Sequence, residues 1–152
     1  MIKRDESKLK VTTVIRQILL KNSELLALVG EKIFPLYAPE GTEGDFVLYV
    51  RDEYSVQYTA MGIFSQQCRV FINVVSDNYD RSQDIAELIL GVLEGDQSNG
   101  LRIRLKDSTE DYEDKKFIQV LLFEISNSII ILFIIGRYII LNYYFYSAYS
   151  CR

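Results

Sequence analysis

QCRVFINVVSDNYDRSQDIAELILGVLEG, residues 67–95, is the stretch that decides the fold of this chain. Its first half predicts a buried strand, because side chains alternate along a strand and every second residue from Cys68 to Val74 is apolar. Asp77 and Asn78 then interrupt the run with residues that favour turns. The second half predicts an amphipathic helix, whose apolar face is formed by Ile85, Leu88, Ile89, Val92 and Leu93. We therefore expect this helix to lie across the sheet that contains the strand, since each buries the apolar side of the other.

Residues with capping chemistry predict where the helices begin and end. Asp80 is a good N-cap for the central helix, and Gln83 completes a pair that resembles a capping box. Gly95 is expected to end this helix in the left-handed conformation. Nearer the N-terminus, helical spacing predicts a helix whose apolar residues are Val11, Val14, Ile15, Ile18 and Leu19. Ser23 is expected to cap a second, short helix that ends at Gly30.

Three further strands are predicted outside the central stretch. They are Phe46–Arg51, with Phe46, Leu48 and Val50 on one side, Leu101–Leu105, which alternates, and Phe117–Ile125, which is apolar on both sides. The segments between elements are predicted to be loops or connections, namely Pro35–Asp45, Asp52–Gln66 and Asp107–Lys116. The order helix, helix, strand, strand, helix, strand, strand predicts a single α+β domain over residues 1–126. We expect a mainly antiparallel sheet with helices packed on one face.

Composition argues against most kinds of chemistry. The chain has 152 residues and a formal net charge of −4, and it contains no histidine, which is the usual general base and metal ligand. The acidic balance does not suit a nucleic-acid-binding surface. The two cysteines, Cys68 and Cys151, have no C-x-x-C partner, and no phosphate-binding glycine motif occurs. The sequence therefore predicts no enzyme, no cofactor and no metal site.

Two segments remain as candidates for function. The connection Asp52–Gln66 is apolar for a loop, because it contains Tyr54, Tyr58, Met61, Ile63 and Phe64. It is either covered by a partner chain or it is a hairpin tip that folds back on its own sheet. The second candidate is a strongly acidic loop that contains Asp107, Glu110, Asp111, Glu113 and Asp114. It lacks the spacing and the glycine of a calcium loop, so a solvated turn is the simpler interpretation.

Residues 127–152 differ in kind from the domain that precedes them. They consist almost entirely of Ile, Leu, Phe, Tyr, Asn and Ser, with Arg137 and Arg152 as their charged residues. Three interpretations stay open. The segment is a marginal membrane span, in which Arg137 offsets much of the insertion free energy. Alternatively it is a hydrophobic segment docked on the domain or on a neighbour, or an extension that was not selected as protein sequence.

The ordered features of the domain resemble the tail completion, or tail terminator, proteins of long-tailed bacteriophages. The resemblance rests on KNSELLALVGEKIFPLYAPEGTEGDFVLYV, RVFINVVSDNYDRSQDIAELILGVLEG and DSTEDYEDKKFIQVLLFEI, and it covers residues 9–126. The segment YSVQYTAMGIF departs from the more polar, glycine-marked loop expected of that family, and residues 127–152 have no counterpart in it.

The resemblance implies a structural, non-enzymatic virion protein. It would form a ring, typically six-fold, at the head-proximal end of the tail tube, made in the host cytoplasm and located in the virion neck. Its partners would be other copies of itself, the tail tube protein and the head–tail connector, with DNA passing through without specific binding. The five apolar residues of 52–66 would then contact a neighbouring subunit, and the five acids of 107–116 would face the lumen or a docking partner. The alternatives are a head-side connector or stopper component, and a membrane-anchored small acidic domain.

Overall fold

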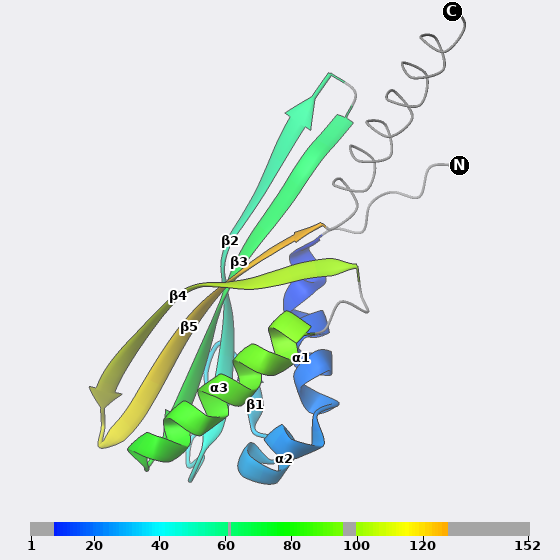
Figure 1. The fold of residues 1–152 in the computed structure, drawn as a ribbon. Helices are drawn as coiled ribbons and strands as arrows, with labels where there is room; N and C mark the ends of the chain where they lie inside the picture. The colour runs from blue at the N-terminus through cyan, green and yellow to red at the C-terminus, as the bar shows by residue number, and fades with distance from the viewer. Residues whose placement is uncertain (1–7, 61, 96–99, 128–152) are drawn as a thin grey trace, which may run out of the picture.

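The computed structural model describes residues 8–60, 62–95 and 100–127, and the predicted C-terminal extension lies outside them apart from Asn127. The described residues form a short 3₁₀ helix, three α-helices and five strands (Figure 1). The helices are η1 Lys8–Lys10, α1 Val11–Leu20, α2 Ser23–Val29 and α3 Tyr79–Gly95. The strands are β1 Ile33–Pro35, β2 Phe46–Thr59, β3 Gly62–Ser76, β4 Leu101–Glu113 and β5 Lys116–Asn127. Among these elements, no helix is both long and apolar enough to cross a membrane.

The five strands form one sheet in the order β1-β2-β3-β5-β4. β1 pairs with β2 in parallel, and every other neighbouring pair is antiparallel. The predicted α+β class with a mainly antiparallel sheet is therefore confirmed. β5 lies between β3 and β4, as expected for a strand that is apolar on both sides.

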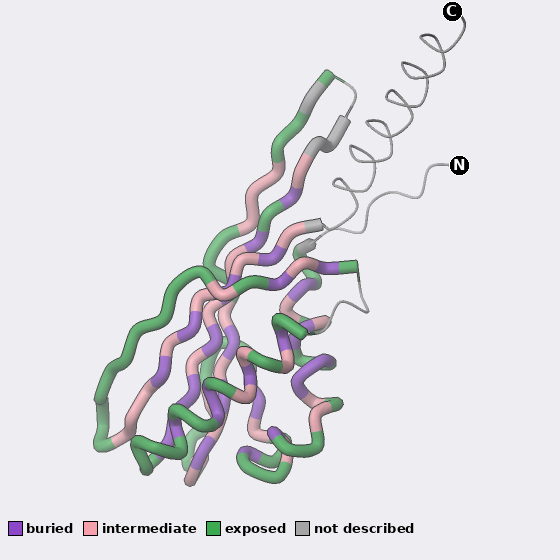
Figure 2. Tube along the Cα trace, viewed as in Figure 1, coloured by how far each residue is buried: buried purple, intermediate pink, exposed green. Residues whose placement is uncertain are grey.

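One side of the sheet and the three α-helices enclose the core. The buried strand residues alternate along β3 and β5, as in Cys68, Val70, Ile72 and Val74, and they meet the apolar faces of α1, α2 and α3 (Figure 2). From α3 the core receives Ile85, Ile89 and Leu93, while Leu88 and Val92 are half-buried. The prediction that this helix lies across the strand 68–74 is thus confirmed.

Both predicted helix caps are wrong by one or two positions. Asn22, not Ser23, caps α2, because its Oδ1 accepts a hydrogen bond of 2.8 Å from the N–H of Leu25. Likewise the Oδ1 of Asn78, not Asp80, accepts from the N–H of Arg81 at 3.0 Å at the start of α3. In each case the asparagine lies where the backbone is still outside the helix, which is the position that a cap must occupy.

The predicted helix ends at glycine have mixed outcomes. Gly30 ends α2 with a φ of +62°, as expected. Gly95 is still helical and has no positive φ, so the left-handed stop predicted there is wrong. Glycine at the end of a helix therefore did not by itself decide the backbone conformation.

The loops predicted at 52–66 and 107–116 are wrong, because both segments are hairpins of paired strands, and for 52–66 this is the hairpin that was left open as the alternative. Residues 52–59 continue β2 and residues 62–66 begin β3, and the two pair as far as Thr59 and Gly62. Residues 107–113 continue β4, which turns at Asp114 and Lys115 into β5. These two turn residues have φ values of +49° and +63°, which suits a two-residue hairpin turn. Figure 1 shows the two hairpin turns at opposite ends of the sheet, where the β2–β3 hairpin extends away from the helices and the β4–β5 hairpin lies beside the start of α3.

Candidate functional site

The end of the β2–β3 hairpin projects as a two-stranded ribbon. β1 pairs only with residues 47–49 of β2, and β5 pairs with β3 only from Gln67 onward. We call residues 54–66 the β2–β3 arm, because past Gln67 its two strands have no third strand beside them among the described residues. An isolated two-stranded ribbon is at best marginally stable in water, so this arm needs support from elsewhere.

The predicted tyrosines of the arm become more exposed toward its tip. The hydroxyl of Tyr54 donates a hydrogen bond of 2.9 Å to Oε1 of Gln66, which is 2% exposed. Tyr58, nearer the tip and paired with Ile63, is 73% exposed. Ile63 and Phe64 belong to β3, although their side chains, like the whole of Met61, lie outside what the structure describes. The structure thus brings Tyr54, Tyr58, Ile63 and Phe64 into one hairpin.

Ion pairs hold the arm where it leaves the sheet. The guanidinium of Arg69 contacts Glu53, and its Nε lies 3.3 Å from a carboxylate oxygen of Asp52. A β-bulge between Arg51 and Glu53 re-aims β2 at the same place. Arg51 also donates to the backbone carbonyl of Leu9 at 2.9 Å, which connects the bend to η1. The direction of the arm is therefore fixed from both sides of the sheet.

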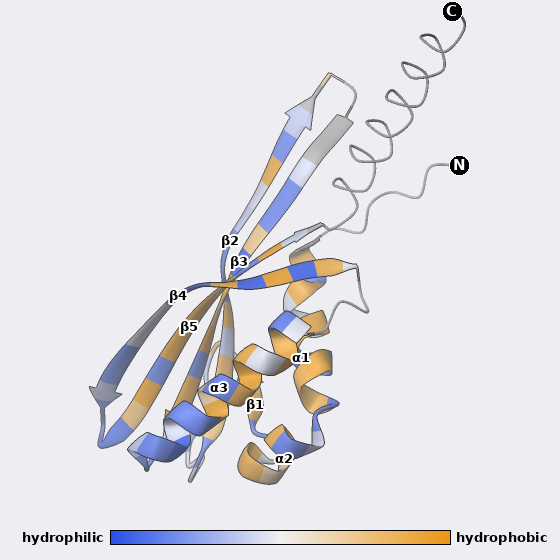
Figure 3. Ribbon diagram, in the orientation of Figure 1, coloured by the Kyte–Doolittle hydropathy of each residue, from blue (hydrophilic) through white to orange (hydrophobic). Residues whose placement is uncertain are grey.

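On the side of the sheet opposite the helices, next to the charged row Glu53–Arg69–Glu124, lies an apolar area that no described helix covers. Its residues come from β2, β3 and β5 and stand in three cross-strand rows: Phe46–Val75–Ile118, Leu48–Asn73–Val120 and Val50–Phe71–Leu122. We call these nine residues the open face. Eight of them are half-buried, and Val75 is 6% exposed although it is not part of the core. Figure 3 shows how apolar residues recur along the interior strands, whereas the far end of β4 is hydrophilic.

Asn73 is the polar residue in the middle row of the open face. Its side-chain Oδ1 is buried and has no hydrogen-bond partner in the part of the chain that the structure describes. Its neighbours across the strands are Leu48 and Val120, which offer no side-chain donor. A buried acceptor in apolar surroundings destabilises a protein unless a donor reaches it.

The predicted acidic cluster is divided between the two sides of the sheet. Glu110 pairs with Gln119 and lies on the helix side, whereas Asp107 and Asp111 pair with Leu122 and Ile118 of the open face. Asp107, Asp111, Glu113 and Asp114 are exposed. Nowhere in the described ranges do three or more Asp, Glu, His or Cys side chains gather in a way that could hold a metal ion.

Glu110 connects β4 to α3 through two donors and to β5 through a third. Its carboxylate accepts from Nε2 of Gln119 at 3.0 Å, from Nε2 of Gln83 at 3.3 Å and from the hydroxyl of Tyr79 at 3.2 Å. The hydrogen bond from Gln119, and then that from Gln83, lower the pKa of the Glu110 carboxyl below its ordinary value. Gln83 thus contributes to this network instead of the capping box predicted for it.

Asp45 is a buried carboxylate that the sequence did not single out. It is 5% exposed, lies 2.5 Å from Nε of Arg81 and accepts a hydrogen bond of 2.7 Å from the hydroxyl of Ser76. These contacts fasten the start of β2 to the end of β3 and the first turn of α3. Asp45 lies between glycine-rich turns and an apolar strand. Nothing in the sequence there distinguishes it from a solvated loop residue.

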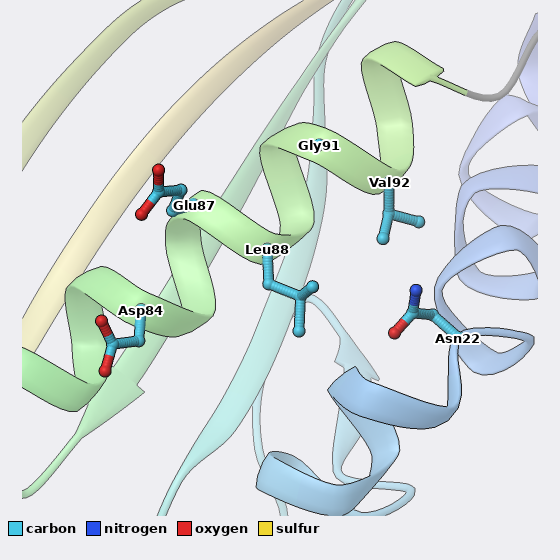
Figure 4. A pocket seen from close by; sticks show the side chains of 6 residues that line it. All are labelled: Asn22, Asp84, Glu87, Leu88, Gly91 and Val92. Carbon is cyan, nitrogen blue, oxygen red and sulfur yellow. The ribbon is translucent and has the colours of Figure 1, made fainter.

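A shallow groove lies between α3 and the residue that caps α2 (Figure 4). It is lined by Asn22, Asp84, Glu87, Leu88, Gly91 and Val92. Among these lining residues no nucleophile is paired with a base. Burial raises the pKa of the Cys68 thiol, which agrees with its place in the core rather than in a reactive site.

Comparison with known proteins decides the family. The family model described as tail completion protein gp17 matches residues 13–125 of the chain. The chain belongs to this family. Tail completion proteins of this family are structural components of phage virions, as the resemblance had implied. No curated protein matches the chain.

A solved structure has a similar fold. A chain in the virion of a native gene transfer agent particle matches with a TM-score of 0.61 and 18% sequence identity. The match covers 74% of this chain and 90% of that one. At this level of identity the likeness concerns the arrangement of strands and helices.

Proposed function

We propose that this tail completion protein forms a ring at the head-proximal end of a phage tail tube, where it ends the tube and joins it to the head connector. Membership of the tail completion family supports the general role. The observation that carries the proposal is the β2–β3 arm, which leaves its own sheet and presents Tyr58 with 73% of its surface exposed. An exposed aromatic residue on a projecting ribbon is suited to contact with another subunit.

In this proposal the acidic end of the β4–β5 hairpin faces the lumen or a docking partner. Asp107, Asp111, Glu113 and Asp114 are all exposed there. A lumen lined with carboxylates repels phosphates, so DNA passes through without being held. The working place of the protein would then be the virion neck, after assembly in the host cytoplasm with tail tube and connector proteins.

The test uses tail tubes made in cells that lack this protein. The purified full chain is added to them, and the tubes are imaged by negative-stain electron microscopy. We expect a ring at one end of each tube and tubes that no longer elongate when more tube protein is supplied. Tubes that stay bare and continue to grow would contradict the proposal.

A further inference from the structure

We infer that the open face of one copy receives the β2–β3 arm of a second copy, so that neighbouring subunits join by packing a two-stranded ribbon on a sheet. The inference rests on the proposed function, because it names the surface that the arm contacts in the ring. It uses two different surfaces of the same chain. Such a heterologous contact generates rings when its rotation closes, whereas a contact between identical faces gives only pairs.

The polarity of α3 and β4 makes the arm a better occupant of the open face than either of these two surfaces. The outward side of α3 carries Arg81, Gln83, Asp84 and Glu87, and all four are exposed. The edge strand β4 is exposed and charged from Lys106 onward, which is how proteins protect an edge from pairing. Placing either surface on the open face would bury charges against apolar side chains. The arm, by contrast, offers Val56 and Tyr58 on strands whose polar residues are uncharged beyond Glu53.

The open face is too small to hold two subunits together by itself. Three strands, each with about five residues, span roughly 250 Å² at the usual spacings between strands and residues. A stable pair needs about 800 Å² from each partner, so neither two open faces nor one arm on one face reaches that area alone. In a head-to-tail ring each subunit is held twice, once through its open face and once through its arm, and the tube end supports all subunits together.

Asn73 places a polar side chain at the centre of the contact, and its Oδ1, which is buried in the single chain, meets a donor from the arm when the amide turns outward. Its unpartnered Oδ1 lies in the middle row of the open face, between Leu48 and Val120. The arm brings hydroxyl donors, foremost that of the exposed Tyr58. Sheet-on-sheet packing places a partner about 10 Å away, a gap that an inward-pointing tyrosine side chain spans.

The arm cannot reach the open face of its own chain. Tyr58 lies ten residues beyond Leu48 on the same strand, which corresponds to roughly 33 Å at the rise of a β-strand. Two cysteines whose Cα atoms are more than about 7 Å apart cannot form a disulfide without movement of the backbone. A disulfide between these two positions therefore has to join different copies.

This geometry gives a direct test by disulfide trapping. Full-length protein with Tyr58→Cys, Leu48→Cys and Cys151→Ser is added to bare tail tubes, oxidised and run on a denaturing gel without reductant. We expect the monomer band to be lost into a ladder of covalent oligomers, and a second pair, Tyr58→Cys with Val120→Cys, to give the same ladder. The matched control pairs Tyr58→Cys with Gln83→Cys, which lies on the helix side, and should leave the monomer band in place.

Several outcomes would overturn the inference. Rings on the tubes without a ladder from either pair would reject it while leaving the proposed function intact. A ladder from Tyr37→Cys with Leu48→Cys instead would assign the open face to the loop after β1, where Tyr37 is 74% exposed. A faster-migrating monomer from Leu48→Cys with native Cys151 retained would show that residues 128–152 of the same chain cover the face. Bare tubes with every variant and with the unmodified chain would reject the proposed function itself.

Discussion

Glu110 on β4 accepts a hydrogen bond of 3.0 Å from the buried side chain of Gln119 on β5, and this bond, with the one from Gln83 on α3, holds its carboxyl in the ionised form. Because the folded-state pKa is lowered, the stabilisation is present above the pKa of the unfolded chain, about 4.3. It is lost as the pH falls through the folded-state value. We expect Glu110→Gln to lower stability at pH 7 and to lose that difference progressively as the pH falls below 4. Urea unfolding at several pH values measures the difference in the free energy of unfolding between the unmodified chain and Glu110→Gln, with Glu113→Gln as control. A difference that stays the same at low pH would contradict the prediction.

The asparagine caps provide a test of the helix starts. We expect Asn22→Ala and Asn78→Ala each to lower the free energy of unfolding by about 1 kcal/mol, because each leaves a backbone N–H without its side-chain acceptor. Ser23→Ala and Asp80→Ala are the matched controls, since these residues follow the caps and lie inside or at the start of the helices. Chemical denaturation of the four variants decides between the positions. A larger loss in the controls would restore Ser23 and Asp80 as the caps.

Asp45 and Arg81 form an ion pair in which the Asp45 side chain is buried and the Arg81 side chain is half-exposed. Arg81→Met leaves the carboxylate of Asp45 with the hydroxyl of Ser76 as its remaining side-chain donor. We expect a loss of about 1–3 kcal/mol in the free energy of unfolding, smaller than for a fully buried pair because solvent reaches Arg81. A double-mutant cycle with Asp45→Asn isolates the coupling. Additive losses would mean that the two side chains do not stabilise each other.

The arm can be tested without altering the core. We expect the triple variant Tyr58→Ser, Ile63→Ser and Phe64→Ser to abolish ring formation on tail tubes, because it removes the apolar contact area of the hairpin end. Tyr37→Ser is the matched control, since Tyr37 is equally exposed but lies in the loop after β1. Electron microscopy and the elongation of the tubes measure the result. Rings formed normally by the triple variant would exclude the arm as the interface.

The acidic hairpin end can be neutralised separately from Glu110, which has a structural role. We expect Asp107→Asn, Asp111→Asn, Glu113→Gln and Asp114→Asn together to leave the fold intact, since all four side chains are exposed. Head joining or DNA passage should fall, because the variant removes the negative charge proposed to face the lumen or partner. Infectivity after complementation measures this, with circular dichroism as the check on folding. Full infectivity would show that the charge has no such function.

The interior elements could be predicted from the sequence because their buried apolar residues recur at the period of a strand or of a helix. Ile72 and Ile89 stand in runs whose spacing matches a strand and a helix, and both are fully buried. The two hairpin ends show no such periodicity, because residues such as Gln57 and Glu113 are exposed. Polarity and acidic charge were therefore interpreted as loops. The turn at Asp114 and Lys115 lacks the glycine that usually marks a positive φ, so its position was not predicted either.

The candidate interaction surfaces were likewise predicted only in part. Tyr54 and Tyr58 were identified from composition alone, because apolar residues in a supposed loop are unusual. The open face was not identified, although Phe46, Leu48 and Val50 were placed together on one side of their strand. Its recognition needed the register between β2, β3 and β5, which sequence periodicity does not supply. The contacts of Asp45 and Glu110 depend on residues 31–36 and 9–31 positions away, respectively, and likewise required the folded chain.

Because helices cover only one side of the sheet, substitutions on its two sides have different effects. Replacement of Ile72 or Phe123, whose side chains point toward the helices, changes how firmly the chain folds. Replacement of Phe71 or Leu122, one position away on the same strands, leaves the side chains beneath the helices in place and changes the opposite side of the sheet. Because both side chains are half-buried, such a change costs some cross-strand packing but not the core. The surface offered to other virion components can therefore vary more freely than the core that holds the subunit together.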